Sequence, residues 1–170
     1  MINSTKGCFY AKISNAMEQI KEITQNELKQ ALDLAEAVFS EFVAKDFSEE
    51  GIKTFNDYLK TKYEEYASGL TSGDKKVWGY FKDGEIIGVL AVRNNSHIAL
   101  MFVDKRHHRK GIAKKLFIHF LKEAEKDEPA EITVNSSPYA VPVYERLGFE
   151  KVSELQEKNG ILFTHMLYDG

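Results

Sequence analysis

Hydrophobic residues recur at helical spacing through the first half of the chain. Residues 24–27 have the form of a capping box, and an amphipathic pattern follows them, which predicts a first helix that ends near Ala44. A second helix is predicted from about Ser48 to Gly69. Aromatic residues form a stripe along this second helix, and at this spacing we interpret them as core rather than as the lining of a ligand pocket: Phe55, Tyr63 and Tyr66.

Residues 76–103 carry the short apolar runs of three consecutive strands. The predicted strands cover residues 76–81, 86–93 and 97–103, with a hairpin turn at 82–85 and another turn at 94–96. The third strand is almost continuously apolar, which is typical of a strand that is buried on both faces.

The second half of the chain alternates between helical and strand patterns. A long amphipathic helix is predicted over about 111–126, followed by a strand over 131–135, a short helix over 139–147 and a closing hairpin of strands 149–155 and 161–168. The strands before and after the long helix should be joined by a right-handed parallel crossover. The expected fold class is therefore α/β, with helices around a mixed sheet.

Residues 1–18 are weakly patterned, and the sequence leaves open whether they hold a strand near 9–13 or a loosely ordered lead-in. The sequence contains no repeat, no low-complexity tract and no linker rich in proline and glycine. We therefore expect one domain over residues 1–170.

Composition narrows the class of protein. With 43% hydrophobic and 29% charged residues, the 170-residue chain has the composition of a folded globular protein. A net charge of −3 argues against binding to nucleic acid or to an anionic membrane. The single cysteine, Cys8, cannot form an internal disulfide, and no apolar run approaches the roughly 20 residues of a membrane span. A cytoplasmic location is the expectation.

A basic turn lies between the third strand and the long helix, where residues 103–116 read V-D-K-R-H-H-R-K-G-I-A-K-K-L. The first turn of a helix presents unpaired backbone N–H groups and a partial positive charge. The small residues Gly111 and Ala113 let an anion approach those groups closely. The spacing matches neither a Walker loop nor a dinucleotide-binding motif. These residues favour a phosphate ligand, with a solvated basic helix start as the alternative.

A second segment, residues 132–149, again leads from a strand into a short helix, with Pro142 in its first turn and Gly148 after its end. It reads I-T-V-N-S-S-P-Y-A-V-P-V-Y-E-R-L-G-F. Together the two segments resemble the GNAT superfamily of N-acetyltransferases. The basic turn is similar to its acetyl-CoA signature, Q/R-x-x-G-x-G/A, and the second segment to its motif N-x-x-x-x-A-x-x-x-Y-x-x-x-G-F.

The resemblance is close over residues 97–152 and carries expectations for the whole domain. It implies a mostly antiparallel sheet of six to seven strands with a central parallel pair, flanked by about four helices. It also implies an N-acetyltransferase without a metal, which moves the acetyl group of acetyl-CoA to a primary amine by direct attack in a ternary complex. The expected partner is a small-molecule or peptide amine, and homodimers are common in the family.

The same resemblance implies roles for individual residues. The pyrophosphate of acetyl-CoA is expected on the backbone at the start of the long helix: Arg109, Lys110, Gly111, Ile112, Ala113 and Lys114. The pantetheine arm is expected to lie along the third strand and to meet an asparagine of the next one: Met101, Phe102, Val103 and Asn135. Tyr144 corresponds to the general acid that protonates the leaving thiolate. His108 replaces the usual Gln or Arg and is expected to donate a pH-dependent hydrogen bond.

The attacking amine must also lose a proton, so the site needs a proton acceptor. Many family members use a carboxylate on the strand that begins at His97, but residues 97–103 contain none. His97 is the single titratable group on that strand, and Glu41 and Asp46 near the end of the first helix are further candidates. A chain of water molecules is our preferred hypothesis.

The residues leave other functions and several acceptors open. A non-catalytic acyl-CoA-binding regulator would explain the missing carboxylate, but Asn135 and Tyr144 argue against it. A nucleic-acid-binding module built on residues 106–110 is disfavoured, because the positive charge is confined to one turn. A polyamine, an aminoglycoside, an amino acid or a protein N-terminus could be the acceptor, and the glutamates of the second helix slightly favour a cationic small molecule.

Overall fold

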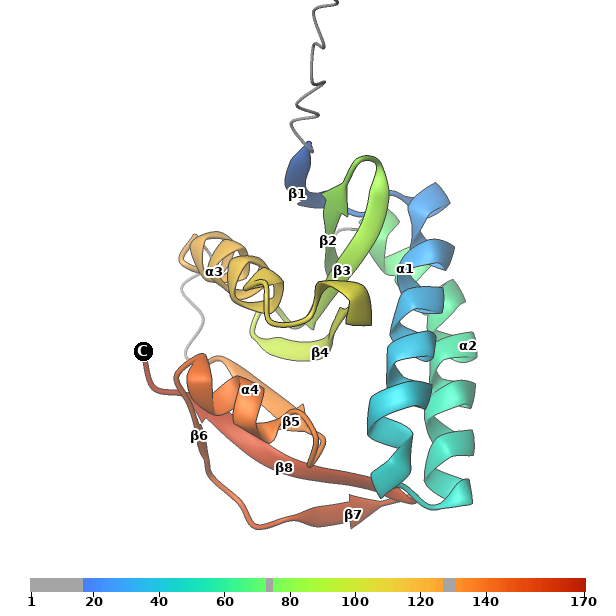
Figure 1. Cartoon of the computed structure of the whole chain (residues 1–170), viewed down its shortest axis with the longest axis vertical. Helices are drawn as coiled ribbons and strands as arrows, with labels where there is room; N and C mark the ends of the chain where they lie inside the picture. Colours follow the sequence, from blue (N-terminus) through green and yellow to red (C-terminus); the bar gives the residue numbers. More distant parts are fainter. Residues whose placement is uncertain (1–16, 73–74, 127–130) are drawn as a thin grey trace, which may run out of the picture.

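The computed structural model describes residues 17–72, 75–126 and 131–170. Strands and α-helices follow one another in the order β1 (Glu18–Glu22), α1 (Gln25–Val38), α2 (Glu49–Ser72), β2 (Lys75–Lys82), β3 (Glu85–Arg93), β4 (His97–Val103), α3 (Ile112–Ala124), β5 (Thr133–Ser136), α4 (Val141–Arg146), β6 (Phe149–Lys151), β7 (Gln156–Lys158) and β8 (Ile161–Tyr168) (Figure 1). A π-helix (Phe39–Val43) and a 3-10 turn (Ala44–Asp46) join α1 to α2, and another 3-10 turn (Lys105–His107) precedes α3.

The strands form a mixed sheet in the order β1-β2-β3-β4-β5-β8-β6, and β7 pairs with β8 beside this path. The β4–β5 pair is parallel and the other pairs are antiparallel. This arrangement confirms the expected mixed α/β fold with a central parallel pair. The sheet has eight strands rather than six or seven. The predicted strand 149–155 forms only β6, the additional strand β7 begins after it at Gln156, and the additional strand β1 lies at the N-terminal edge.

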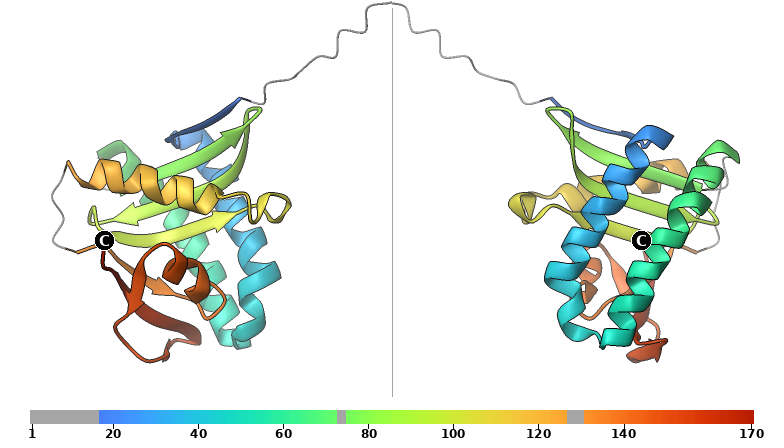
Figure 2. Two further views of the ribbon diagram at one scale, coloured as in Figure 1. Left: turned by 60° about the vertical axis from the view of Figure 1, so that its left-hand side comes forward. Right: turned by 90° about the vertical axis from the view of Figure 1, so that its right-hand side faces the viewer.

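Each face of the sheet carries its own apolar core. Helices α1 and α2 cover one face, and α3 and α4 cover the other (Figure 2). The core under α1 and α2 includes Leu28 and Tyr66, and the core under α3 includes Trp78 and Phe117. Strand β3 is buried between both cores along all but its two end residues. This two-sided burial explains why the central strands read as continuous apolar runs.

An extra residue in β4 changes which face its side chains occupy. Ala91 pairs with Leu100 and Val92 pairs with Ile98, so Ala99 is a bulge without its own partner in β3. Because side chains alternate along a strand, the bulge places Ile98 in the core under α3 and Leu100 in the core under α1 and α2. A bulge also bends its strand, and this one lies just after the residues that pair with β5.

The helices occupy their predicted positions, and the first one changes geometry at its end. The capping box is present, with the Thr24 backbone N–H and hydroxyl both bonded to the Glu27 carboxylate at 2.9 and 2.7 Å. From Phe39 the backbone continues as a π-helix, a form that is frequent at functional sites. The Phe42 ring on this π-helix lies near the rings of His108 and Tyr139, with centroid distances of 5.1 and 5.6 Å.

The two ends of the chain differ from the prediction. The proposed strand near residues 9–13 lies outside the described residues, and the N-terminal strand of the structure is β1, which pairs with β2 at the edge of the sheet. Its sequence, EQIKE, has no apolar alternation that would have revealed it. At the other end, β6 and β7 both pair with β8, and the residues between them leave the ladder.

Candidate active site

Strands β4 and β5 separate after only two residue pairs. His97 pairs with Thr133 and Ile98 with Val134, whereas β4 runs on to Val103 without further pairing to β5. On its other side β4 stays paired with β3 along its length. The C-terminal half of β4 therefore has one open edge, which we call the β4 slot (the unpaired side of Met101–Val103). The family resemblance implied that the pantetheine arm lies along this part of the strand.

The pairing register shows which backbone groups face the β4 slot. The Asp104 N–H donates to the Ile87 carbonyl at 2.9 Å, next to the Gly88–Val103 pair. Antiparallel pairs alternate between bonded and non-bonded, so Phe102 also bonds to β3, whereas the N–H and C=O groups of Met101 and Val103 point into the slot. Phe102 was predicted to offer its backbone, but the register directs that backbone to β3 and its side chain lines the cavity described below.

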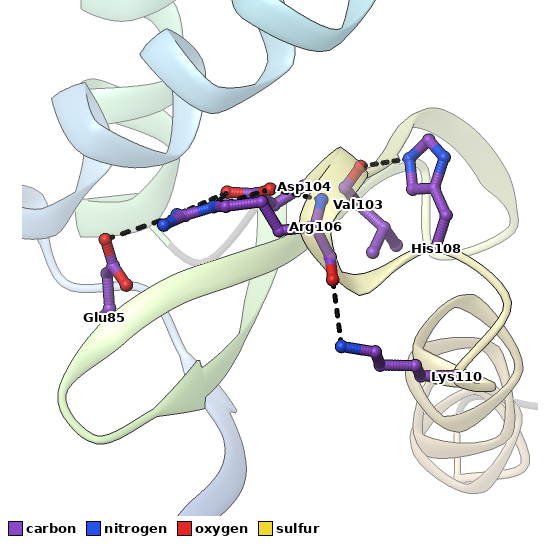
Figure 3. A network of polar contacts seen from close by, with 6 residues as sticks. All are labelled: Glu85, Val103, Asp104, Arg106, His108 and Lys110. Carbon is purple, nitrogen blue, oxygen red and sulfur yellow. Dashed lines mark hydrogen bonds and ion pairs between the residues drawn. The ribbon is translucent and has the colours of Figure 1, made fainter.

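Polar contacts fix the loop that leads from β4 to α3 (Figure 3). The Asp104 carboxylate accepts from the Arg106 backbone N–H at 2.8 Å and from its guanidinium at 2.7 Å, and Glu85 lies 3.5 Å from the same guanidinium. The hydrogen bonds from Arg106 lower the pKa of Asp104 to about 2. Lys110 donates to the Arg106 carbonyl at 2.9 Å. Arg106 and Lys110 thus hold the shape of the loop.

The backbone at the start of α3 presents a row of free donors. Arg109 and Gly111 have positive φ angles of 60° and 76°, which turns the chain sharply into the helix. The six consecutive N–H groups from Arg109 to Lys114 have no acceptor within the part of the chain that the structure describes. A Cβ on Gly111 would meet nothing within 4 Å, so the approach to these groups is open. Such a concave row of N–H groups at a helix N-terminus fits a phosphate.

His108 contacts the β4 slot from the loop. Its Nε2 lies 2.7 Å from the Val103 carbonyl oxygen, and its ring faces Phe42. The sequence predicted that His108 would donate to the phosphates. In the structure this ring nitrogen instead ties the loop to the last residue of β4, so the imidazole is a spacer between the predicted phosphate site and the slot.

Asn135 and Tyr144 lie on the other side of the β4 slot. The Asn135 side-chain oxygen lies 2.8 Å from Nδ1 of His165 across the β5–β8 pair, which leaves the Asn135 amide N–H groups free to donate. Tyr144 is 5% exposed, packs edge-on against Phe149 and forms no hydrogen bond with any described residue. Burial raises the pKa of Tyr144 well above its usual value, so its hydroxyl stays protonated.

One large cavity joins these features and has a volume of about 1320 Å³. It is lined by the start of α3, the β4 slot, Asn135 and Tyr144, and it extends to the π-helix, α2 and the β7–β8 turn. Tyr144 and all of the residues predicted to bind the cofactor line it except Lys110, whose side chain turns back to the loop. Six cationic side chains line the cavity: Arg93, Lys105, Arg109, Lys114, Arg146 and Lys158. Among the described residues, no aspartate or glutamate does so.

The candidates for a general base fall into two groups. Glu41 forms an ion pair with Lys105 at 3.0 Å, and neither Glu41 nor Asp46 lines the cavity. His97 does line it, with Nδ1 at 2.8 Å from the Thr133 hydroxyl. Burial, followed by the nearby charge of Arg93, lowers the pKa of His97 to about 4, so the imidazole is neutral at pH 7. His97 is available as a weak proton acceptor.

Sequence reasoning missed part of this cavity. Phe39, Phe55 and Tyr58 line it, although the aromatic stripe of the second helix was interpreted as core, and Tyr66 of that stripe is indeed buried in the core. The spacing could not separate the two roles, because both kinds of residue lie on the inner face of a helix. Arg93 was also missed, and its signal is a charged residue at the end of an otherwise apolar strand.

In residues 17–72, 75–126 and 131–170 no group of three or more His, Cys, Asp and Glu side chains is arranged to hold a metal ion. None of the helices within these ranges has the length and apolar character needed to cross a membrane.

Comparison with known proteins places the chain among acetyltransferases. It is 28% identical over 105 residues to the UPF0157 protein YqkA of Bacillus subtilis, and 34% identical over 91 residues to the uncharacterized N-acetyltransferase YafP of Escherichia coli. These matches cover 59% and 53% of this chain, but only 31% of YqkA and 57% of YafP. The chain thus spans slightly less than a third of YqkA and somewhat more than half of YafP.

The fold is shared with solved structures of the same class. A GCN5-related N-acetyltransferase from Rhodopseudomonas palustris matches with a TM-score of 0.74 at 17% identity, over 89% of this chain and 95% of that one. The PaiA N-acetyltransferase from Thermoplasma acidophilum, in complex with coenzyme A, matches with a TM-score of 0.69 at 18% identity, over 88% and 98%. The sequence profile of the acetyltransferase (GNAT) domain matches residues 43–169. The chain belongs to the GNAT acetyltransferase family.

Proposed function

We propose that the protein transfers the acetyl group of acetyl-CoA to a primary amine by direct attack within a ternary complex. The observation that carries this proposal is the row of free N–H groups from Arg109 to Lys114, which lies directly beyond the open edge of β4. Acetyl-CoA has a pyrophosphate that suits the helix start and an amide-bearing arm that suits a strand edge. The coenzyme A complex of the Thermoplasma acidophilum relative supports the choice of this donor.

The pantetheine arm would bind in the β4 slot. Its amides would bond to the N–H and C=O groups of Met101 and Val103 and, on the other side, accept from the Asn135 amide. The Val103 carbonyl already accepts from His108, but a carbonyl oxygen has two lone pairs and can accept a second hydrogen bond. This arrangement would direct the thioester along β4 toward His97.

The reaction would then need no covalent enzyme intermediate. The amine lone pair attacks the thioester carbonyl carbon, a C–N bond forms, and the tetrahedral intermediate collapses by breaking the C–S bond. The sulfur leaves as a thiolate, whose conjugate thiol has a pKa of about 8.5. Because the Tyr144 phenol is the weaker acid, we assign its hydroxyl to stabilise the thiolate by a hydrogen bond as charge develops. The thiolate is protonated fully once the product is released.

The amine nitrogen must lose one proton during this step. Since no carboxylate from the described residues lines the cavity, water is the proposed acceptor, with the neutral His97 imidazole beside it. A missing carboxylate also suits a non-catalytic acyl-CoA-binding regulator, which is the second candidate function. Tyr144 and Asn135 favour catalysis, because both line the cavity at the positions that the family motif assigns to them.

Calorimetric titration with acetyl-CoA and with desulfo-coenzyme A tests the proposal. We expect both ligands to bind with micromolar affinity, since they share the pyrophosphate and the pantetheine amides. A screen of primary amines at pH 8 should then find thiol release that depends on both substrates. Binding without turnover would favour the regulator, and no binding at low ionic strength would reject both functions.

A further inference from the structure

The side of the cavity under α1 and α2 has an aromatic wall contributed by three different elements. Phe39 of the π-helix stacks on Phe55 of α2, with ring centroids 3.6 Å apart, and Phe55 meets Phe102 of β4 edge-on at 6.2 Å. All three line the cavity. A wall of this kind suits an apolar or aromatic body, which gains both from burial and from ring geometry.

One cation lies on the same face of the sheet as this wall, four residues along β3 from Val89, which pairs with Phe102. Arg93 ends β3 directly opposite His97, lines the cavity and forms no ion pair with any described residue. Burial is the main cause of the low pKa of His97, and the charge of Arg93 is the second. The same charge also lowers the pKa of Tyr66 of α2, against the larger effect of burial, which raises it. The guanidinium therefore acts on the α1–α2 side of the sheet, where the aromatic wall lies.

Arg93 is too far from the start of α3 to serve the phosphates of acetyl-CoA. It pairs with the first residue of β4, whereas Arg109 to Lys114 follow the last residue of that strand. A seven-residue strand spans about 20 Å at about 3.3 Å per residue. Arg93 and the start of α3 thus lie at opposite ends of β4, and the phosphates of the proposed donor use only the start of α3.

The second site disfavours an acceptor with several positive charges. The glutamates of α2 that slightly favoured such an acceptor, Glu49, Glu50, Glu64 and Glu65, do not line the cavity. A polyamine or an aminoglycoside would bring additional cations beside Arg93 without a carboxylate from the described residues to neutralise them. A carboxylate on the acceptor would have the opposite effect, because a guanidinium binds carboxylates through paired hydrogen bonds.

We infer that the acceptor is a small amine that also carries a carboxylate and an apolar or aromatic side chain, as in a hydrophobic α-amino acid. Its carboxylate binds Arg93, and its side chain extends along the same face of the sheet toward Phe55 and Phe102, with buried Phe39 stacked behind Phe55. This inference rests on the proposed acetyl transfer. It also accounts for the missing general base, because burial next to a guanidinium lowers the pKa of the bound amine and raises the fraction that is neutral and able to attack.

Matched pairs of amines test the inference. Phenylalanine with 2-phenylethylamine, and leucine with isoamylamine, differ only in the carboxylate, and spermidine represents the polycationic acceptors. We expect kcat/KM to be about 10- to 100-fold higher for each amino acid than for its decarboxylated partner, as one charged hydrogen-bonded pair provides. Calorimetric titration of each pair into the coenzyme A complex should show the same preference without turnover.

Substitutions at Arg93 test whether this residue causes the preference for amino acids over their decarboxylated partners. Arg93→Gln should remove it by weakening the amino acids alone, and Arg93→Lys should retain part of it because the charge remains. Equal use of the paired amines, a preference for spermidine, or a preference that survives in Arg93→Gln would overturn the inference. Acetyl-CoA binding, measured on the same samples, distinguishes the inferred acceptor from the proposed function. If the protein does not bind acetyl-CoA, the proposed function is rejected. If it binds acetyl-CoA but gives any of these results, only the inferred acceptor is rejected.

Discussion

Gly51 in the first turn of α2 packs directly against Gly160 in the β7–β8 turn, and neither position has room for a side chain. A Cβ on Gly51 would lie 2.0 Å from the Gly160 carbonyl oxygen, and a Cβ on Gly160 would lie 2.3 Å from the Gly51 nitrogen. Close by, the Thr54 hydroxyl donates to the Asn159 carbonyl at 2.9 Å. Thr54 and Asn159 both line the cavity, so this contact between glycines closes the cavity between α2 and the β7–β8 turn.

Gly51→Ala should therefore destabilise the protein despite the better helix propensity of alanine. Alanine gains about 1 kcal/mol over glycine within a helix, whereas forcing a methyl group into a tight contact costs about 1–3 kcal/mol. We expect a lower midpoint in urea unfolding and a raised KM for the acceptor. Lys60→Ala, at an exposed position of α2, is the control and should leave both unchanged. A variant as stable as the wild type would show that α2 and the β7–β8 turn can move apart without a loss of free energy of unfolding.

Gly111→Glu should abolish acetyl-CoA binding, because its carboxylate would occupy the row of free N–H groups at the start of α3. Any non-glycine residue at φ 76° also adds about 1–2 kcal/mol of backbone strain, which Gly111→Ala shares without the charge. Calorimetry on the two variants separates strain from charge repulsion. If Gly111→Glu still binds acetyl-CoA as the wild type does, the pyrophosphate does not sit there.

Tyr144→Phe should lower kcat by about 100-fold while the dissociation constant for acetyl-CoA stays the same, since the hydroxyl is assigned to the leaving thiolate alone. The hydroxyl has no hydrogen-bond partner among the described residues, so its removal should not lower the thermal unfolding midpoint. Steady-state kinetics and a melting curve on one preparation measure both effects. Unchanged turnover would remove Tyr144 from the mechanism.

The histidine at the start of β4 should make stability depend on pH. The pKa of His97 is about 4 in the folded protein against 6.5 in the unfolded chain, so between these values the unfolded chain binds the additional proton. Stability should therefore fall as the pH drops from about 6.5 towards 4. Denaturant unfolding at several pH values measures this, and in His97→Gln, which stays neutral, the slope over that interval should be smaller. Equal slopes for both proteins would contradict the lowered pKa.

The motif residues could be read from the sequence because each depends on local chemistry. Gly111 and Gly148 both adopt the positive φ that their turns require, and Asn135 and Tyr144 line the cavity that contains the start of α3. The proposed acceptor site could not be predicted in the same way, since Arg93, Phe39 and Phe55 come from three elements that meet only in the fold. The bulge at Ala99 is likewise invisible in the apolar run of β4, although it decides which core each side chain enters.

The sheet is continuous in its order of strands but is fastened across its middle by only two residue pairs of β4 and β5. The sheet therefore has two parts, which we call its two leaves: strands β1 to β4 and strands β5 to β8. The short β4–β5 pairing joins the two leaves, and α2 contacts both of them. A ligand whose amides bond to both β4 and β5 would extend the connection between these two parts beyond the two residue pairs. Its stabilising effect would grow with the logarithm of its concentration, reaching about 2.7 kcal/mol at one hundred times the dissociation constant. It should also suppress amide exchange on both leaves together, since neither could then move without the other.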